Sequence, residues 1–307
     1  MARAGSLQTP DVVLQNLRGR HVDPKGLAFE GLLLLALLLA LAILVTLLVD
    51  VAQSGVGVLM ERGTDFVRSP LSSLPERAGV WQGIVGSFLI MVFVAVIAFP
   101  IGIGAAVYLE EYAPDTKFTR FITVNIRNLA GVPSVVYGLL GLAVFVELTA
   151  GFTGGDSLIS GGLTIAILVL PIVIITASEA LRAVPDSIRE AGFGVGATRW
   201  EVVRSHVLPA AAPGILTGCV LSISRALGET APLLLVGAIT GFLASGSLYE
   251  QLYEPFTSLP TIIFAWSREP EVDFRELTSA AIVVLLLVIL TANAAAILLR
   301  NRYERKW

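Results

Sequence analysis

Long runs without a charged residue constrain this chain more than any other feature of its sequence. Five such runs have 19 to 29 residues, and about 20 apolar residues in a helix cross the hydrocarbon core of a bilayer. A sixth apolar segment, 205–249, is interrupted by Arg225 and Glu229. We therefore predict an all-α, polytopic membrane helix bundle with six transmembrane helices. The uninterrupted runs are Gly31–Val49, Trp81–Leu109, Asn128–Val146, Ser157–Ser178 and Leu277–Leu299.

The composition excludes an ordinary soluble enzyme. Charged residues make up 15% of the 307 residues, whereas soluble domains contain about 25%. The net charge of -3 provides no basic surface for nucleic acid, so we expect no nucleic-acid partner. The single cysteine, Cys219, cannot form an internal disulfide.

The sequence contains no nucleotide-hydrolysing motif. None of its three lysines follows a glycine and precedes serine or threonine, which excludes a GxxxxGK[ST] phosphate-binding loop. His21 and His206 lie far apart in the sequence, so we expect no metal site built on them. No serine–histidine–aspartate set is visible either. We therefore predict that the chain is not an enzyme on its own, that it has no catalytic residues and that it holds no cofactor.

The distribution of Lys and Arg predicts cytoplasmic N and C termini. This orientation places 15 basic residues on the cytoplasmic side and five outside, in agreement with the positive-inside rule. The first 27 residues include Asp11 and Asp23 and precede a long apolar run, which argues against a cleaved signal peptide. We expect a multi-pass protein in contact with membrane lipid.

This topology divides the chain into three parts. Residues 1–27 form a cytoplasmic N-terminal segment, residues 28–300 a transmembrane domain, and residues 301–307 a cytoplasmic tail. The transmembrane domain includes a cytoplasmic segment, 185–209, and an external loop, 241–276.

The external loop 241–276 has six acidic and two basic residues. We interpret it either as a solvated loop or as a surface that receives an external binding protein. Its negative balance argues against capture of an anion by the loop itself. Phe264 and Trp266 within it are expected at the membrane interface.

The segment 185–209 has the pattern of two short helices. Ser187 with Glu190 and Thr198 with Glu201 each fit the capping box S/T-x-x-E. Three glycines between the two boxes favour a bend. The pattern is compatible with a membrane-parallel loop and with a helix that docks on a cytoplasmic partner.

The same segment resembles the EAA motif of ABC-importer permeases, which reads EAA, three residues, G, nine residues, I, one residue and LP. Gly192 replaces the second alanine and His206 the isoleucine, without a change of spacing. In that family this loop is the coupling helix that sits in a groove of the ATPase subunit, so the resemblance implies that role here. The matching positions are Glu190, Ala191, Gly192, Gly196, Leu208 and Pro209.

Arg225 and Glu229 are four residues apart and share one helix face. If their span starts near Pro213, Arg225 lies about 18 Å along the helix, near the bilayer midplane. A charge there costs at least ~2.5–3.5 kcal/mol, so it should face the bundle interior and a partner such as Glu229. The pair is either a structural ion pair or a gate, since a guanidinium forms bidentate bonds with tetrahedral oxyanions.

Two further strings are collinear with the EAA-like segment. Arg225–Pro232, RALGETAP, resembles the fifth-span motif of phosphate-specific ABC permeases, the PstA/PstC family. Asn128–Leu142, NLAGVPSVVYGLLGL, resembles the third-span entry of that family, and the string GETAPLL favours the PstA branch. Ser134 and Tyr137 in the second string offer hydroxyls to an anion or serve helix packing.

The resemblance implies a type I ABC importer permease fold and one permease half of an ATP-driven inorganic phosphate importer. The implied location is a prokaryotic cytoplasmic (inner) membrane. The implied partners are a PstC-like permease in a heterodimer, a PstB-like ATPase dimer that uses ATP and Mg, and a PstS-like external phosphate-binding protein.

Three other functions compete with this interpretation. A permease of the same fold can carry another oxyanion, such as sulfate, molybdate or phosphonate. A secondary transporter or channel is driven by a gradient and needs no ATPase. A membrane sensor or scaffold predicts no uptake defect when Arg225 is changed.

Overall fold

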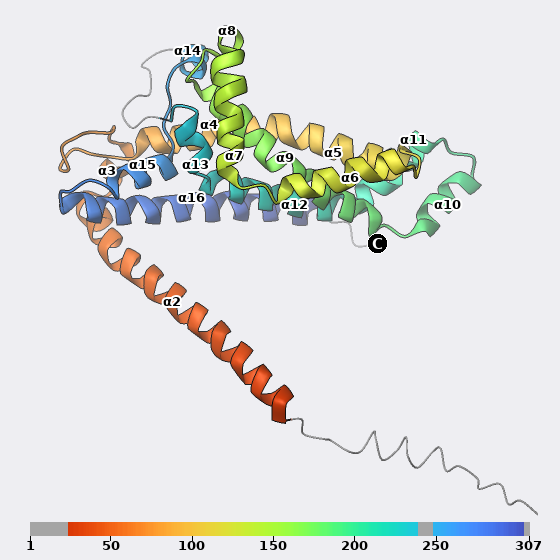
Figure 1. The fold of residues 1–307 in the computed structure, drawn as a ribbon, viewed down its shortest axis with the longest axis horizontal. Helices are drawn as coiled ribbons and strands as arrows, with labels where there is room; N and C mark the ends of the chain where they lie inside the picture. The colour runs from red at the N-terminus through yellow and green to blue at the C-terminus, as the bar shows by residue number, and fades with distance from the viewer. Residues whose placement is uncertain (1–23, 239–247, 304–307) are drawn as a thin grey trace, which may run out of the picture. The chain divides into compact units, whose positions relative to one another are not determined.

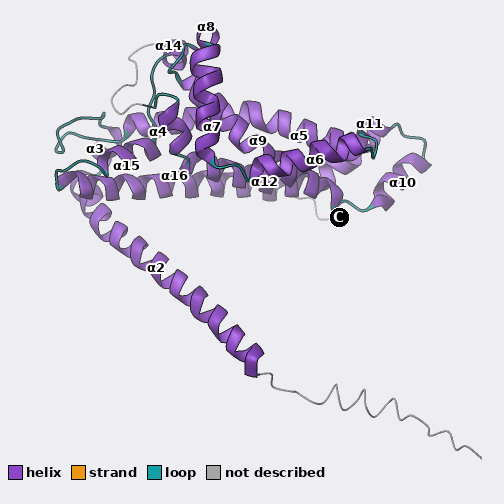
Figure 2. Cartoon of the chain, in the orientation of Figure 1, coloured by secondary structure: helices purple, strands orange, loops and turns teal. Residues whose placement is uncertain are grey.

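The computed structural model describes residues 24–238 and 248–303 (Figure 1). These residues form helices joined by turns, and no strand occurs within the two ranges (Figure 2). Most of the predicted N-terminal segment 1–27, including His21, lies outside the described residues. So do part of the predicted loop 241–276 and most of the tail 301–307.

The helices follow one another along the chain with short connections, and four stretches, η1 to η4, have π-helical hydrogen bonding. The order is α2 (Pro24–Arg62), α3 (Thr64–Arg68), α4 (Trp81–Phe93), η1 (Val94–Ala98), α5 (Phe99–Val107), η2 (Tyr108–Tyr112), α6 (Lys117–Ala130), α7 (Ser134–Gly141), η3 (Leu142–Leu148), α8 (Ala150–Thr153), α9 (Leu158–Arg182), α10 (Asp186–Gly194), α11 (Arg199–Val202), η4 (Val203–Val207), α12 (Leu208–Gly228), α13 (Ala231–Leu235), α14 (Leu248–Tyr253), α15 (Leu259–Trp266) and α16 (Asp273–Tyr303).

Within residues 24–238 and 248–303, five continuous helical stretches are long and apolar enough to cross a membrane. They confirm five of the six predicted spans, with different ends. The stretches are Pro24–Arg62, Trp81–Tyr112, Leu158–Arg182, Arg199–Gly228 and Asp273–Leu298.

The predicted third span, Asn128–Val146, falls on a bent pair of helical stretches and not on one continuous helix. The chain breaks between α6 and α7, and the two helical stretches meet at an angle of 100°. Pro133 causes the break, because it has no N–H to donate and disfavours helical geometry at Val132. A sixth span is reached only if this bent pair crosses as one unit.

The chain divides into two compact units, Met1–Asp50 and Val51–Trp307. In the first, every described residue, 24–50, is exposed, and Leu35 and Leu37 are each 65% exposed. Exposed leucine along a whole helix is the pattern of a helix surrounded by lipid or by another membrane helix.

In the second unit, α9 is the central helix, in contact with α4, α5, α7 and α12. Small residues let these helices approach closely. A Cβ added at Gly102 of α5 would lie 2.7 Å from Val173 of α9, and one at Gly214 of α12 would lie 2.7 Å from Ala180. Figure 1 shows α5, α9, α12 and α16 running along one another.

The predicted external loop 241–276 is not a generic solvated loop. It contains α14 and α15, and α15 is buried against α4 and α16. Trp266 is 5% exposed, with its ring centroid 5.8 Å from that of Phe274, so its side chain packs inside the bundle, and its position at the membrane interface stays a prediction. Phe264 is half-buried, and the Arg268 guanidinium lies 4.2 Å above its ring. The loop prediction failed because its charges stand on either side of an apolar helix.

Candidate functional site

Residues 185–209 form two short helices separated by a bend, as the sequence predicts. The first is α10, and the second, α11, continues through η4 into α12. Gly196 lies between them with φ +82°, a left-handed conformation that glycine adopts without strain.

One of the two predicted capping boxes is confirmed and the other is wrong. The Thr198 backbone N–H donates to Glu201 Oε2 at 2.8 Å, and the Thr198 side chain accepts from the Glu201 backbone. Ser187 is not a cap, because α10 begins one residue before it, at Asp186, after extended Pro185.

The EAA-like residues mostly face outward. Glu190, Ala191, Gly196 and Pro209 are exposed, whereas Leu208 is half-buried and Gly192 is buried. A Cβ at Gly192 would lie 2.7 Å from Val202 Cγ2, so close packing of α10 on α11 accounts for glycine instead of the second alanine.

Large apolar side chains surround these positions and have little cover from the rest of the chain. Phe193 is 49% exposed, Val195 85% and Trp200 55%. Exposed aromatic and aliphatic side chains gathered on one segment are typical of a surface that binds another protein.

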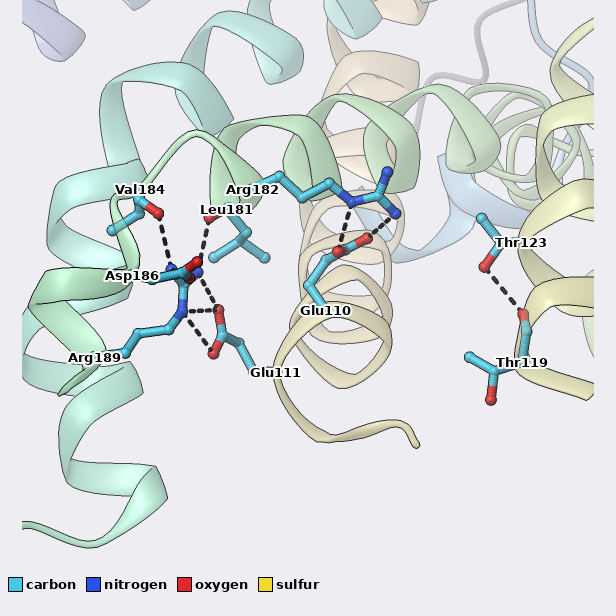
Figure 3. Close-up of polar contacts among 9 residues, drawn as sticks. All are labelled: Glu110, Glu111, Thr119, Thr123, Leu181, Arg182, Val184, Asp186 and Arg189. Carbon is cyan, nitrogen blue, oxygen red and sulfur yellow. Dashed lines mark hydrogen bonds and ion pairs between the residues drawn. The ribbon is translucent and has the colours of Figure 1, made fainter. Parts of the chain in front are cut away.

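An ion pair that the sequence did not predict anchors α10. Arg189 Nη2 lies 2.7 Å from Oε1 of Glu111, which belongs to η2 and is 5% exposed (Figure 3). The hydrogen bond to Glu111 raises the pKa of Arg189 above its ordinary value, while burial acts in the opposite direction. The Arg189 guanidinium also donates to the carbonyls of Leu181 and Val184 at the end of α9.

A second pair lies beside the first. Arg182, the last residue of α9, donates through Nε and Nη2 to the two carboxylate oxygens of Glu110, both at 2.7 Å (Figure 3). The sequence gives one weak signal for these pairs. Glu110 and Glu111 follow the charge-free run 81–109, and Arg182 and Arg189 follow the run 157–178.

The predicted pair Arg225–Glu229 is present, with Nε 3.3 Å from Oε1. The helical stretch that contains Arg225 begins at Arg199, whereas the start of the membrane span near Pro213 stays a prediction. Arg225 lies in the last turn of α12, and Glu229, with ψ 126°, ends the helix. The ion pair lies at a break between α12 and α13, and part of the predicted segment 205–249 lies outside the described residues.

Ser134 and Tyr137 lie one turn apart on α7, which packs against α13, the helix that follows this pair. Tyr137 is 7% exposed, and its hydroxyl donates to the Leu129 carbonyl at 2.9 Å. A Cβ at Gly138 would lie 2.7 Å from Pro232 Cα, so α7 packs tightly on α13.

An open hollow of about 330 Å³ adjoins the helix break after Glu229. Neither Arg225 nor Glu229 lines it, and it offers few polar groups. Its lining consists of Val135, Thr230, Ala231, Leu234, Leu235 and Phe264.

Comparison with known sequences identifies relatives over most of the chain. Residues 98–306 match the family described as "Binding-protein-dependent transport system inner membrane component". The phosphate transport system permease protein PstA of Haemophilus influenzae is 30% identical over 266 residues, which cover 87% of this chain and 90% of that protein.

Two further relatives have higher identity over a shorter length. PstA 1 of Mycobacterium tuberculosis is 35% identical over 230 residues, 74% of this chain and 73% of the relative. The probable ABC transporter permease protein YqgI of Bacillus subtilis is 35% identical over 199 residues, 65% of this chain and 66% of the relative.

Solved structures with the same fold include ABC importer permeases. A chain of a bacterial alginate ABC transporter superimposes with a TM-score of 0.62 at 12% identity, covering 95% of this chain and 96% of that one. A chain of the MetNI methionine ABC transporter superimposes with a TM-score of 0.59 at 18% identity, covering 76% of this chain and 100% of that one. At these identities the likeness concerns the fold alone.

Proposed function

The chain belongs to the family of binding-protein-dependent transport system inner membrane components, and we propose that it is the PstA-type permease subunit of an ATP-driven inorganic phosphate importer. The observation that carries the proposal is the 30–35% identity to proteins named PstA, over as much as 90% of a relative's length. The fold supports it, since the matched structures are ABC importer permeases.

In this proposal the helix break after α12 borders the substrate path. The 3.3 Å contact between Arg225 and Glu229 leaves the Arg225 side chain 41% exposed and therefore accessible to another ligand. A phosphate has the tetrahedral oxygens and charge to compete with Glu229 for it. Ser134 on α7 supplies a further hydroxyl, whereas the buried Tyr137 hydroxyl would have to give up its hydrogen bond to the Leu129 carbonyl to bind the anion.

In the same proposal the segment 185–209 couples the path to ATP hydrolysis. Its exposed residues around Glu190 and Gly196 dock on a cytoplasmic PstB-like ATPase dimer, which uses ATP and Mg and performs all the hydrolysis. A PstC-like permease supplies the other half of the path, and a PstS-like protein delivers phosphate from outside. The distribution of basic residues supports cytoplasmic termini in this proposal.

Alternating access follows from this arrangement. ATP closes the ATPase dimer, the coupling segments of both permeases move with it, and the cavity between the permeases opens to the other side of the membrane. The chain contributes the path and the coupling, and its substrate affinity depends on which side the cavity faces.

Uptake of labelled phosphate into cells with and without this chain tests the proposal. The cells must lack other phosphate importers, and unlabelled phosphate, sulfate, molybdate and phosphonate serve as competitors. We expect uptake that requires the chain and that only unlabelled phosphate suppresses. Suppression by sulfate, molybdate or phosphonate would assign the permease to that oxyanion instead. Uptake that survives loss of the ATPase would point to a gradient-driven transporter.

A further inference from the structure

The end of the span Trp81–Tyr112 presents two adjacent carboxylates to two different arginines. Glu110 binds Arg182 at the end of α9, and Glu111 binds Arg189 in α10 (Figure 3). Consecutive residues of η2 are thus tied to two segments that follow one another in the chain. No local motif requires this arrangement, because the paired residues are 72 and 78 positions apart.

The guanidinium of Arg189 has donor contacts in all the directions its geometry offers. Nε and Nη2 contact Glu111, Nη2 also donates to the Leu181 carbonyl at 2.9 Å, and Nη1 donates to the Val184 carbonyl and to Asp186. An arginine has five N–H donors in a fixed plane, whereas a lysine has three on one atom. Only arginine therefore joins η2, the end of α9 and the start of α10 in one contact.

The burial of the pair makes it a fixed connection. The Glu111 side chain is 6% exposed and that of Arg189 18%. A carboxylate at that burial that lost its cation would remain charged without compensation, which is strongly unfavourable. The adjacent pair differs, since the side chain of Arg182 is 50% exposed.

We propose that Glu111 is a positioning residue, which acts through Arg189 to make α10 move as one body with the ends of the spans Trp81–Tyr112 and Leu158–Arg182. The proposal rests on the proposed coupling function of the segment 185–209. A displacement of α10 by the ATPase is then transmitted directly to two spans, in addition to the span that continues from α11. Glu110 and Arg182 hold those two spans to each other at the same level.

The first test compares ATP hydrolysis with transport in the reconstituted complex of the chain with its partner permease, ATPase and external binding protein. Glu111→Gln keeps the size of the side chain but removes its charge, and Arg189→Lys keeps the charge but loses the fixed plane of donors. We expect each variant to raise the number of ATP molecules hydrolysed per anion transported by about tenfold, with the amount of assembled complex unchanged. Asp115→Asn is the matched control, because it breaks an exposed pair with Arg120 close to η2 and should leave the ratio unchanged.

Hydrolysis and transport that fall in equal proportion would indicate a loss of assembly or folding and would overturn the proposal. So would an unchanged ratio in both variants. The anion used is the one that the unmodified complex transports, so failure with phosphate itself would contradict the proposed substrate and not the role of Glu111.

A second test needs no substrate and holds even if one variant assembles poorly. Spin labels at Ser187→Cys in α10 and Tyr108→Cys in η2, both exposed positions, report the distance between these elements in a Cys219→Ala background. We expect one narrow distance distribution that is the same with and without ATP, and a broadened one when Arg189→Lys is added. A distance that changes with ATP in the otherwise unmodified complex would show that α10 moves relative to η2, and would overturn the proposal.

Discussion

Two arginine–carboxylate pairs in this molecule have the same chemistry and opposite surroundings. Arg225 and Glu229 are four residues apart at one helix end, with side chains 41% and 17% exposed and a single contact of 3.3 Å. Arg189 and Glu111 are 78 residues apart, with side chains 18% and 6% exposed and a shortest contact of 2.7 Å. The second pair has additional carbonyl partners, and for the first pair no other hydrogen bond was found among the described residues.

This difference means that the Arg225 pair is suited to exchange its partner for another ion, whereas the Arg189 pair is suited to hold helices in a fixed position. The strength of an ion pair depends on how far water is excluded from it. An exposed pair contributes little to stability, and its members are free to bind another ion. A buried pair with every donor satisfied resists the loss of either member. We therefore expect the Arg189 pair to matter most for stability and the Arg225 pair most for transport.

The largest expected effect is on stability, from Glu111→Ala. Removal of the buried carboxylate leaves the Arg189 guanidinium without its main partner, and we expect a loss of about 3 kcal/mol. Thermal unfolding of the purified complex in detergent measures it. Glu110→Ala is the control, and it should cost less because its partner Arg182 is 50% exposed. Equal losses for the two variants would mean that burial does not distinguish the pairs.

The next effect is on transport, from Arg225→Gln. Glutamine cannot hold a phosphate through two charged bonds, and we expect anion uptake to fall by at least about thirtyfold. The unfolding midpoint should change little, since the pair is partly exposed. Arg225→Lys should retain part of the uptake because it preserves the charge. Normal uptake by Arg225→Gln would mean that the Arg225–Glu229 pair is only a structural contact. The two pairs would then not differ in function.

A smaller effect tests how rigidly α10 packs next to its anchor. Gly192→Ala restores the alanine of the EAA pattern, yet its Cβ would lie 2.7 Å from Val202 Cγ2. We expect a net destabilisation of about 1 kcal/mol, because the clash exceeds the gain in helix propensity. In the double variant Gly192→Ala/Val202→Ala the loss should be smaller than the sum of the two single losses, because the truncated Val202 makes room for the new Cβ although its own burial is lost. A more stable Gly192→Ala protein would show that α10 adjusts its position easily, contrary to a fixed anchor.

The sequence predicted what depends on neighbouring residues. Charge-free runs identified four of the five continuous spans, the apolar segment around Arg225 identified the fifth, and the spacing of Thr198 and Glu201 identified a helix start. Arg225 and Glu229 were paired correctly because residues four apart meet on a helix. Each of these inferences needs no knowledge of how distant segments pack.

Most of the failures concern how distant segments pack. The break at Pro133 is an exception, because the proline is a local signal, but the apolar composition continues across it and the run was counted as one span. The helix α15 was read as loop, because a buried eight-residue helix has no strong signature between charged flanks. The partnership of Glu111 and Arg189 was missed, since it joins the ends of two spans that meet only in the folded bundle.

The smallest expected effect on stability comes from breaking the most exposed of these ion pairs, between Asp115 and Arg120. Asp115 and Arg120 form a pair at 3.0 Å with side chains 84% and 71% exposed. Asp115→Asn should cost less than about 0.5 kcal/mol and leave anion uptake unchanged, because water already screens these charges.

Thermal unfolding at low and high salt checks this value, since salt should weaken the pair in the unmodified complex and have no such effect in the variant. A loss as large as that of Glu110→Ala would contradict the ranking by exposure. It would mean that another subunit covers Asp115 in the assembled complex. The exposures within this chain alone would then underestimate burial at the end of η2, and the Glu111 pair would be more deeply enclosed in the complex than in the single chain.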